Sequence, residues 1–376
     1  MKIVLKNVTP LHIGTGDKYP LCQLLVLSER NGKRKIAVRL KTQTLSKVFS
    51  KHPDLFEKIF QPLNLTKKEI AEIQDGFLYE VSIYSKKRTG RILEIIHHPD
   101  GSVYIPGSSL KGAIRLALTW YVLKNHPEYL EKFKKIVEDD IAENRKKKKK
   151  SERKKFIKTR EFLNSIFRIN NDMHSDYFRF LRISDSSRVY TRVVVHDVGV
   201  FYVERTNKNP LLFPAEFVPL NRTFEFDVKF AKEEYENFAG RYRVNLPDNV
   251  EDILKIVNDF YTEVFNFERE RFRKAKENFK GIDISKIEER FGEIEEHKEK
   301  NILVHIGYGG GLMANSLFIL LDEETRKRVR NLIKEHGDSE APLTRRYLVQ
   351  KVENNEYKLI SPIGWCVLCL EDSPST

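Results

Sequence analysis

The chain of 376 residues is long enough for two domains, and its 40% of hydrophobic residues suffices to build a core in each. No apolar run reaches the roughly 18 to 20 residues that cross a bilayer, and the N-terminus lacks the apolar core of a signal peptide, so we expect a cytoplasmic protein without membrane contact. Three cysteines exclude a disulfide framework, and Cys366-Val-Leu-Cys369, inside an apolar run, indicates a buried strand rather than a zinc site.

The formal net charge of +13 is concentrated in one segment. Arg145–Arg160 holds eleven Lys or Arg against one Glu, which leaves only +3 for the rest of the chain. A like-charge block of this kind is typical of a solvated or disordered loop, and an arm that follows nucleic-acid phosphates is the alternative. We expect order to fall between about residues 143 and 158.

The N-terminal part alternates between strand and helix patterns. Lys2–Val8 alternates with a period of two and predicts an opening strand, which the turn-rich segment Thr9–Gly16 follows. Further along, the patterns predict four strands and two helices. The strands are Cys22–Leu27, Lys35–Leu40, Phe77–Tyr84 and Arg91–Ile96, and the helices are Thr42–Ser50 and Thr66–Gln74.

The segment Tyr104-Ile-Pro-Gly-Ser-Ser-Leu-Lys-Gly-Ala-Ile-Arg115 joins a short strand to a helix. Pro106-Gly107 breaks the strand, and Ser108 or Ser109 is expected to cap the helix. Lys111 and Arg115 lie four residues apart near a helix N-terminus, whose free N–H groups favour an anion. An ordinary amphipathic helix with two solvated cations is the alternative. A nucleotide-hydrolase P-loop is excluded, because that motif needs Lys and then Ser or Thr after its second glycine.

A charged helix is expected from Pro127, and strands resume after the basic segment at Tyr177–Ile183, Arg192–Arg205 and Arg222–Phe230. A helical run at about residues 249–300 follows, and then an apolar strand ends in glycines at Asn301–Gly311. The mixture lacks a regular βα repeat and favours an α+β fold. We place the domains at residues 1–150 and 160–376, each presenting a glycine loop and cations suited to a sugar–phosphate backbone.

Three motifs together resemble the RAMP proteins of CRISPR–Cas systems. Their order and spacing are similar to those of the fifth Csm subunit of type III-A effector complexes, and they cover almost the whole chain. The motifs are Thr9-Pro-Leu-His-Ile-Gly-Thr-Gly16, Ile105-Pro-Gly-Ser-Ser-Leu-Lys-Gly-Ala-Ile-Arg115 and Gly307-Tyr-Gly-Gly-Gly311. Shorter segments that add to the resemblance are Arg182-Ile-Ser-Asp-Ser186, Pro342-Leu-Thr-Arg-Arg346 and Gly364-Trp365.

The resemblance implies two ferredoxin-like, RRM-related domains with helical insertions. It also implies a non-catalytic subunit that binds the guide RNA (crRNA), caps the 3′ end of the complex and is needed for maturation of the crRNA intermediate in antiviral defence. The implied partners are the crRNA, the backbone RAMP subunit, the small helical subunit and host ribonucleases that trim the crRNA 3′ end. We expect neither a metal nor another cofactor, because no His, Cys or Asp cluster has ligand spacing.

The residues expected to contact the guide RNA come from the three motifs and from an arginine pair near the predicted strand Tyr347–Val352. We expect cations to hold phosphates and glycines to act through their backbone, by letting RNA approach or by making a tight turn. For the arginine pair, contact with the neighbouring backbone subunit or with solvent stays open. The set is His12, Gly14, Gly16, Ser108, Ser109, Lys111, Arg115, Gly309, Gly310, Gly311, Arg345 and Arg346.

Other functions stay open on the sequence alone. A metal-independent RAMP endoribonuclease would need a base, an acid and a cation around one phosphate, for which His12, Tyr308 and Lys111 are candidates. The longer glycine pattern of that class is only partly met here. Asp17 and Asp185 are the carboxylates to test for metal-assisted cleavage, although a turn-closing role is favoured for Asp185. A structural cap that touches protein alone and the terminal RAMP subunit of type III-B complexes are the remaining alternatives.

Overall fold

The computed structural model describes residues 1–30, 34–53, 65–85, 90–147, 156–203, 210–333, 344–352 and 356–370. We expected order to fall at about residues 143–158, and most of that range, residues 148–155, lies outside the described residues. On either side of them, helices α4 (Pro127–Lys146) and α5 (Ile157–Ile166) are formed. In the part described, no helix is long and apolar enough to cross a membrane.

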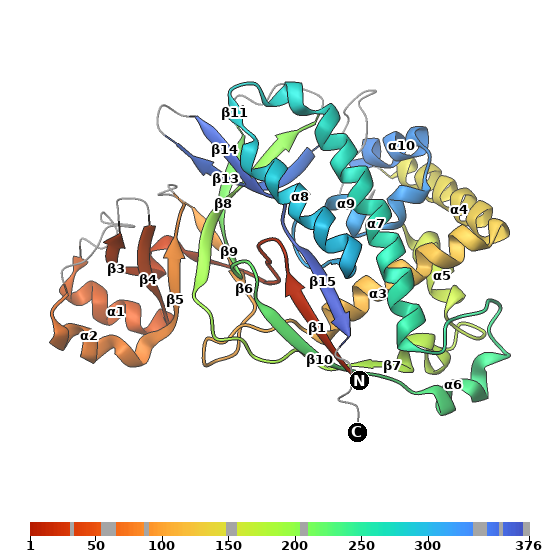
Figure 1. Ribbon diagram of the computed structural model, residues 1–376, viewed down its shortest axis with the longest axis horizontal. Helices are drawn as coiled ribbons and strands as arrows, with labels where there is room; N and C mark the ends of the chain where they lie inside the picture. The colour runs from red at the N-terminus through yellow and green to blue at the C-terminus, as the bar shows by residue number, and fades with distance from the viewer. Residues whose placement is uncertain are drawn as a thin grey trace.

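A five-stranded sheet with the order β12-β15-β1-β10-β7 lies at the centre of the molecule (Figure 1). Strand β1 forms as expected, because its period of two buries Ile3 and Leu5 on one face. It pairs antiparallel with β10 on one side and β15 on the other. The strands are β1 (Lys2–Asn7), β7 (Leu181–Ile183), β10 (Thr223–Phe230), β12 (Ile302–His305) and β15 (Trp365–Leu370).

This central sheet takes strands from both stretches that the sequence suggests as domains. Strand β1 belongs to residues 1–150, whereas its two neighbours belong to residues 160–376. One hydrophobic core also joins side chains from both stretches, such as Leu118 and Phe260. The two stretches therefore share a sheet and a core, and the domain boundary that we placed at the basic segment stays a prediction.

The second sheet is ten-stranded and branched. Its main path has the order β11-β14-β13-β8-β5-β4-β3, and β9, β6 and β2 extend from β8 as a second branch. The strands are β2 (Gly14–Pro20), β3 (Leu24–Arg30), β4 (Arg34–Leu40), β5 (Phe77–Ile83), β6 (Arg91–Ile95), β8 (Val193–Tyr202), β9 (Leu211–Phe217), β11 (Ile282–Asp283), β13 (Thr344–Lys351) and β14 (Tyr357–Ser361).

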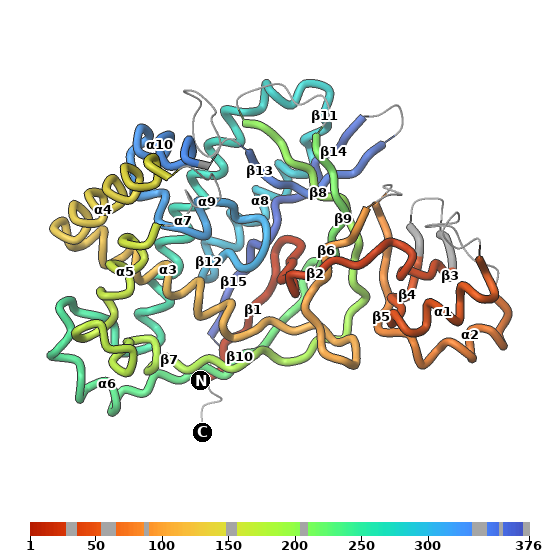
Figure 2. Tube along the Cα trace, turned by 180° about the vertical axis from the view of Figure 1, so that it is seen from behind, coloured from red at the N-terminus to blue at the C-terminus, as the bar shows by residue number. Residues whose placement is uncertain are grey.

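Strands β3, β4 and β5 and helices α1 (Thr42–Lys51) and α2 (Lys67–Ile73) form a lobe at one end of the molecule, on the left in Figure 1 and on the right in Figure 2. The lobe has a small core of its own, to which Leu25, Leu40 and Val48 belong. Thr66 and Glu69 form a capping box at the start of α2. The lobe therefore has its own local stabilisation at the end of the ten-stranded sheet.

The larger helices lie against the central sheet and toward the end opposite the lobe (Figures 1 and 2). Helices α3 and α7 pack on each other, and α7 begins at a cap in which Asn249 Oδ1 accepts the Asp252 N–H at 2.8 Å. The helical run expected at about residues 249–300 forms α7 and α8. The bounds are α3 (Gly107–Asn125), α6 (Lys232–Ala239), α7 (Val250–Lys274), α8 (Ser285–Lys300), α9 (Gly311–Ala314) and α10 (Glu323–Ile333).

Helices and strands are thus mixed without a regular βα repeat, which confirms the α+β class. The predicted strand Tyr177–Ile183 is only partly formed. Tyr177–Arg179 is a 3-10 helix, and β7 begins at Leu181. The reason is local, because the Asp176 carboxylate accepts the Phe178 N–H at 3.1 Å and holds the chain in a turn.

Candidate nucleic-acid interface

The N-terminus of α3 is capped from another part of the chain. The predicted cap by Ser108 or Ser109 is wrong, because α3 begins at Gly107 and Pro106 occupies the cap position without a side-chain bond. Instead, Asp185 Oδ1 accepts the Gly107 N–H at 2.8 Å. Asp185 thus caps a helix that is distant in the chain, whereas a local turn was expected, and its carboxylate already supplies a negative charge at the helix end.

The segment around Asp185 fastens the α3 motif to the central sheet. The Ile105 N–H donates to Ser186 Oγ at 2.9 Å, and the Ser186 N–H donates to the Ile105 oxygen at 3.0 Å. A Cβ atom at Gly107 would collide with the main-chain oxygen of Ser184, so only glycine fits at the first helical position. Two segments that the sequence singled out separately are therefore one structural unit.

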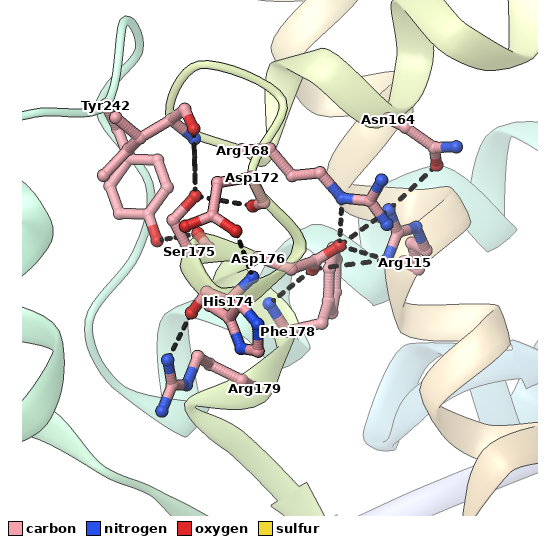
Figure 3. A network of polar contacts seen from close by, with 11 residues as sticks. Arg115, Asn164, Arg168, Asp172, His174, Ser175, Asp176, Phe178, Arg179 and Tyr242 are labelled. Carbon is pink, nitrogen blue, oxygen red and sulfur yellow. Dashed lines mark hydrogen bonds and ion pairs between the residues drawn. The ribbon is translucent and has the colours of Figure 1, made fainter.

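Arg115 of α3 is part of a polar network that reaches the segment Asp172–Arg179 (Figure 3). Its Nη1 lies 3.4 Å from Asp176 Oδ1, and its Nη2 donates to Asn164 Oδ1 at 3.1 Å. Arg168 Nε donates to the same Asp176 carboxylate at 2.9 Å, and the Arg115 guanidinium lies 4.7 Å from the centre of the Phe178 ring. Arg115 thus joins α3, α5 and the turn before β7, whatever else it binds.

Lys111 differs from Arg115 although it lies on the same helix. Its side chain is partly buried, and no hydrogen bond or ion pair of its ammonium group is found within the described residues. Burial lowers the pKa of Lys111, the nearby Asp176 opposes this shift, and Arg115 adds to it. A phosphate placed beside Lys111 would therefore stabilise a charge that the protein itself leaves poorly compensated.

The two glycine-bearing loops of the sequence meet in the fold. The Tyr308 N–H donates to the main-chain oxygen of His12 at 2.8 Å, and the Gly364 N–H donates to that of Pro10 at 3.0 Å. Gly307 has a φ of +76°, and a Cβ atom there would collide with the His12 oxygen. The Thr9–Gly16 and Gly307–Gly311 motifs are therefore held edge to edge by their backbones.

The imidazole of His12 faces the protein interior. It is 3% exposed, and its Nδ1 lies 2.6 Å from the main-chain oxygen of Glu216. Burial lowers the pKa of His12, and the bond to Glu216 opposes this only in part, so the ring is neutral at pH 7. Its ring lies 5.7 Å from that of Tyr308, centre to centre. The contribution of His12 to the loop pair comes from its main-chain oxygen.

Of the five glycines expected to face RNA, Gly309 and Gly310 pack tightly against protein. A Cβ atom at Gly309 would lie 2.6 Å from Ile363 Cβ, and one at Gly310 would lie 2.6 Å from His305 Cε1. Gly309 and Gly311 have positive φ values of +109° and +59°. Gly16 is different, since its φ is +94° but the space around a Cβ atom is open. The glycine pattern at residues 309–311 is thus a requirement of the fold itself.

Arg345 and Arg346 are adjacent in β13 and point in opposite directions. Arg345 is 5% exposed, with Nε 3.7 Å from Glu268 Oε1, and its guanidinium makes no hydrogen bond within the described residues. Burial raises the pKa of Glu268, and Arg345 opposes that shift. Arg346 is exposed, and its guanidinium lies 5.3 Å from the centre of the Tyr308 ring. Of the pair, only Arg346 is available to a ligand at the surface.

A cleft of about 760 Å³ lies between the first half of α3, helices α4 and α5, and the segment His305–Leu321. We call it the α3 cleft. Ser108, Ser109, Gly112 and Arg115 line it from α3, and Gly307 lines it from the second glycine loop. The structure therefore brings the α3 motif and the first residue of the Gly307–Gly311 motif to one cavity.

Sequence reasoning missed most of the α3 cleft. Its apolar walls include Phe133 of α4, Leu163 of α5 and Phe318, and its polar residues include Arg160 and His305. Arg160 and His305 lie in segments that the sequence singled out, but without a role in a cavity. The apolar residues carry no motif, and an apolar residue of an amphipathic helix gives no signal for lining a cavity rather than a core. Tyr308 beside Arg346 was likewise not recognised as a pair.

The arrangement offers little for catalysis by the residues considered. His12 is buried, Asp185 is engaged with Gly107, and Asp17 is exposed, with its N–H donating to Thr15 Oγ1 at 3.0 Å. Over the described ranges, no group of three or more His, Cys, Asp or Glu side chains is placed to hold a metal ion. The site instead consists of cations, glycine backbone and an apolar cleft.

Comparisons with known proteins place the chain in a family. The model of the RAMP superfamily matches residues 4–314. The chain is 27% identical to the CRISPR system protein Csm5 of Methanocaldococcus jannaschii, over 98% of this chain and 89% of that protein. The resemblance recognised from the motifs is thereby confirmed.

Two solved structures share the fold. One is a chain of the cryo-EM structure of a Csm–crRNA–target RNA ternary complex from a type III-A CRISPR–Cas system, with a TM-score of 0.67, 23% identity and coverage of 98% of this chain and 100% of that chain. The other is the crystal structure of Csm5 from T. onnurineus, with a TM-score of 0.60, 21% identity and coverage of 97% and 99%. With its sequence matched over most of its length, the chain belongs to the RAMP superfamily.

Proposed function

We propose that this chain is a crRNA-binding subunit of a type III-A CRISPR effector complex that caps the 3′ end of the guide. In this role it is needed for maturation of the crRNA intermediate, and so for antiviral defence in the cytoplasm. Its protein partners are the backbone RAMP subunit and the small helical subunit of the complex. The similarity to Csm5 of Methanocaldococcus jannaschii over nearly the whole chain supports this assignment.

One observation carries the proposal: motifs far apart in the chain converge on one surface. The Thr9–Gly16 and Gly307–Gly311 loops are joined through His12 and Tyr308, and the second of them shares the α3 cleft with the start of α3. Exposed or half-exposed cations accompany them at Lys111, Arg160 and Arg346. Such cations hold the phosphates of a nucleic acid without reading its sequence.

We propose that the chain binds the guide and does not cleave it. The three residues considered for metal-independent cleavage are differently placed, since His12 is buried and neutral, whereas Lys111 lies on α3. Trimming of the 3′ end is then the work of host ribonucleases that the subunit admits or recruits. The arginine Arg346, beside Tyr308, is a candidate for contact with either the guide or the backbone subunit.

The test is binding of labelled crRNA to the purified full chain over a salt series. We expect the logarithm of the affinity to fall linearly with the logarithm of salt concentration, with a slope of about −0.7 for each phosphate contact, and the RNA to stay full length. Lys111→Ala should reduce this slope by roughly one contact. Lys47→Ala, the same charge change on α1 in the lobe, is the matched control.

Two outcomes would reject the assignment. Equal affinity at low and high salt contradicts a phosphate-based mode of binding. Discrete shortening of a repeat RNA by the pure chain without metal would instead support the endoribonuclease. The capping position is tested by placing 4-thiouridine along the guide of the assembled complex, where cross-links to this chain should appear only near the 3′ end.

A further inference from the structure

We propose that the α3 cleft takes one unstacked base of single-stranded RNA, with the adjoining phosphate at the arginines that line it, Arg115 and Arg160. This inference rests on the proposed function and adds to it a defined base subsite. It gives the cleft a role in holding the end of the guide that is separate from contacts to the phosphate backbone.

The size and the walls of the cleft suit a base. A volume of about 760 Å³ lies within the range of about 300 to 1,000 Å³ that is usual for small-ligand sites. The walls are formed largely by apolar side chains, among them Phe133, Leu163 and Phe318. Leu312 at the end of the glycine loop is 38% exposed while it lines the cleft. Aromatic and aliphatic surfaces of this kind stack on the faces of bases without selecting their sequence.

The charges around the cleft favour an anion over an apolar peptide. Arg115 and Arg160 line it, and Lys111 lies one helical turn before Arg115 on α3. The charge of Arg115 is shared with Asp176, so Arg160 and Lys111 carry most of this preference. Arg160 is exposed. No Asp or Glu occurs among the described residues that line the cleft. A ligand that is flat and apolar at one end and anionic at the other matches this distribution, and a nucleotide within RNA is such a ligand.

His305 adds one polar group to the wall. It is 2% exposed and lines the cleft, and its Nε2 lies 2.8 Å from the main-chain oxygen of Ile363. That bond requires the proton on Nε2, which leaves Nδ1 as an acceptor. Nδ1 has no hydrogen-bond partner within the described part of the chain. The N–H of a base that reaches this nitrogen is a donor that would satisfy it.

Gly112 provides a way to fill the cleft without disturbing the fold. It lies within α3 and lines the cleft, and a Cβ atom there would have no other heavy atom within 4 Å. Because this open space adjoins the cleft, we expect a large side chain at this position to fill the cleft without displacing the core. Gly112→Trp is the blocking variant and Gly112→Ala is its matched control, and both should melt at or above the wild-type temperature, since glycine disfavours a helix interior.

The experiment measures the affinity of the full chain for the 3′ segment of the guide and for a series in which one base at a time is removed to leave an abasic site. We expect one position at which loss of the base weakens wild-type binding about tenfold, the size of one stacking contribution. Gly112→Trp should bind the intact RNA about tenfold more weakly and be insensitive to base loss at that position. Gly112→Ala should behave as wild type.

The same measurements separate the ways in which the idea can fail. If wild type and Gly112→Trp bind intact RNA equally well and no abasic site matters, the base subsite is wrong while the proposed function stands. If wild type binds no RNA at all, the proposed function itself is wrong. If AMP or UMP binds wild type and not Gly112→Trp, yet no abasic site matters, the cleft takes a free nucleotide and the proposal is overturned. A Gly112→Trp chain that binds RNA normally but no longer enters the complex assigns the cleft to a protein partner, which also overturns it.

Discussion

The carboxylate of Asp185 accepts a hydrogen bond of 2.8 Å from the main-chain N–H of Gly107, the first residue of α3. A negative group thus already occupies the end of the helix that the sequence offered to an RNA phosphate. The cations Lys111 and Arg115 lie one and two turns further along α3. A bound phosphate is therefore expected beside the first turns of α3 rather than at its free N–H groups.

Asp185→Ala should lower the free energy of unfolding by about 1 kcal/mol, because it removes the cap of α3 and the charge that complements its dipole. Asp185→Asn keeps an acceptor and should lose less. Urea denaturation of the two variants measures the difference. Asp227→Ala, in the neighbouring strand β10, is a control for loss of a nearby carboxylate, and an Asp185→Ala variant as stable as that control would contradict the cap.

Arg115→Ala should mainly reduce the stability of the protein, whereas Lys111→Ala should mainly reduce its RNA binding. Arg115→Ala should lose about 2 kcal/mol, because it breaks charged hydrogen bonds to Asp176 and Asn164. Lys111→Ala should change stability by less than about 0.5 kcal/mol and weaken RNA binding, since none of the described residues holds its ammonium group. Thermal melting and RNA titration of each single variant are the measurements. Equal losses of stability in both variants would contradict this division.

Substitutions of the two adjacent arginines of β13 should also differ in their effects on stability and on RNA binding. Arg345→Ala leaves the buried Glu268 without its cation and should cost about 3 kcal/mol or more. Arg346→Ala removes an exposed guanidinium from above Tyr308 and should cost less than about 1 kcal/mol, while reducing RNA affinity. Denaturant unfolding with RNA titration distinguishes them. The assignment fails if Arg346→Ala is the variant that unfolds.

The arginine pair also shows where prediction from the sequence ends. Alternation along a strand implies that neighbours such as Arg345 and Arg346 face opposite ways. Which of the two is buried depends on Glu268 of α7, a residue distant in the chain, and no local pattern contains that information. No sequence pattern predicts that His12 and Tyr308 meet, or that the imidazole of His12 points inward.

Elements with a strong hydrophobic periodicity could be predicted from the sequence. Strands that form only because they pair with a neighbouring strand could not. Strand β1 and helices α3 and α7 carry their own hydrophobic pattern, so the sequence predicts them well. Strand β2 contains glycines and ends in a proline, and its composition indicates a turn, yet it pairs with β6. Strand β9 has Pro214 in its middle, opposite Asp197 of β8, and proline argues against a strand on composition alone.

Two glycines with positive φ should respond differently to alanine. Gly309→Ala places a Cβ atom 2.6 Å from that of Ile363 in addition to straining the backbone, so we expect a loss of about 2 kcal/mol or more. Gly16→Ala meets open space and carries only the backbone strain, of about 1 kcal/mol. Melting curves of the two variants test this. Equal effects would show that packing beneath Gly309 is unimportant.

The buried histidine His305 should make stability depend on pH. Burial lowers its pKa to about 4, from an ordinary value of 6.5, and the bond to Ile363 opposes this only in part. Since the unfolded chain takes up the proton first, the stability that the neutral ring contributes is complete above pH 6.5 and is lost as the pH falls toward 4. His305→Gln removes this titration, so its free energy of unfolding should fall by about 1 kcal/mol less per pH unit across that window than that of wild type.

Urea denaturation at half-unit steps between pH 4 and 7.5 measures both slopes, with the same exchange at the exposed His174 as the control. Wild-type and His305→Gln slopes that coincide would mean that the ring is not held neutral by the fold.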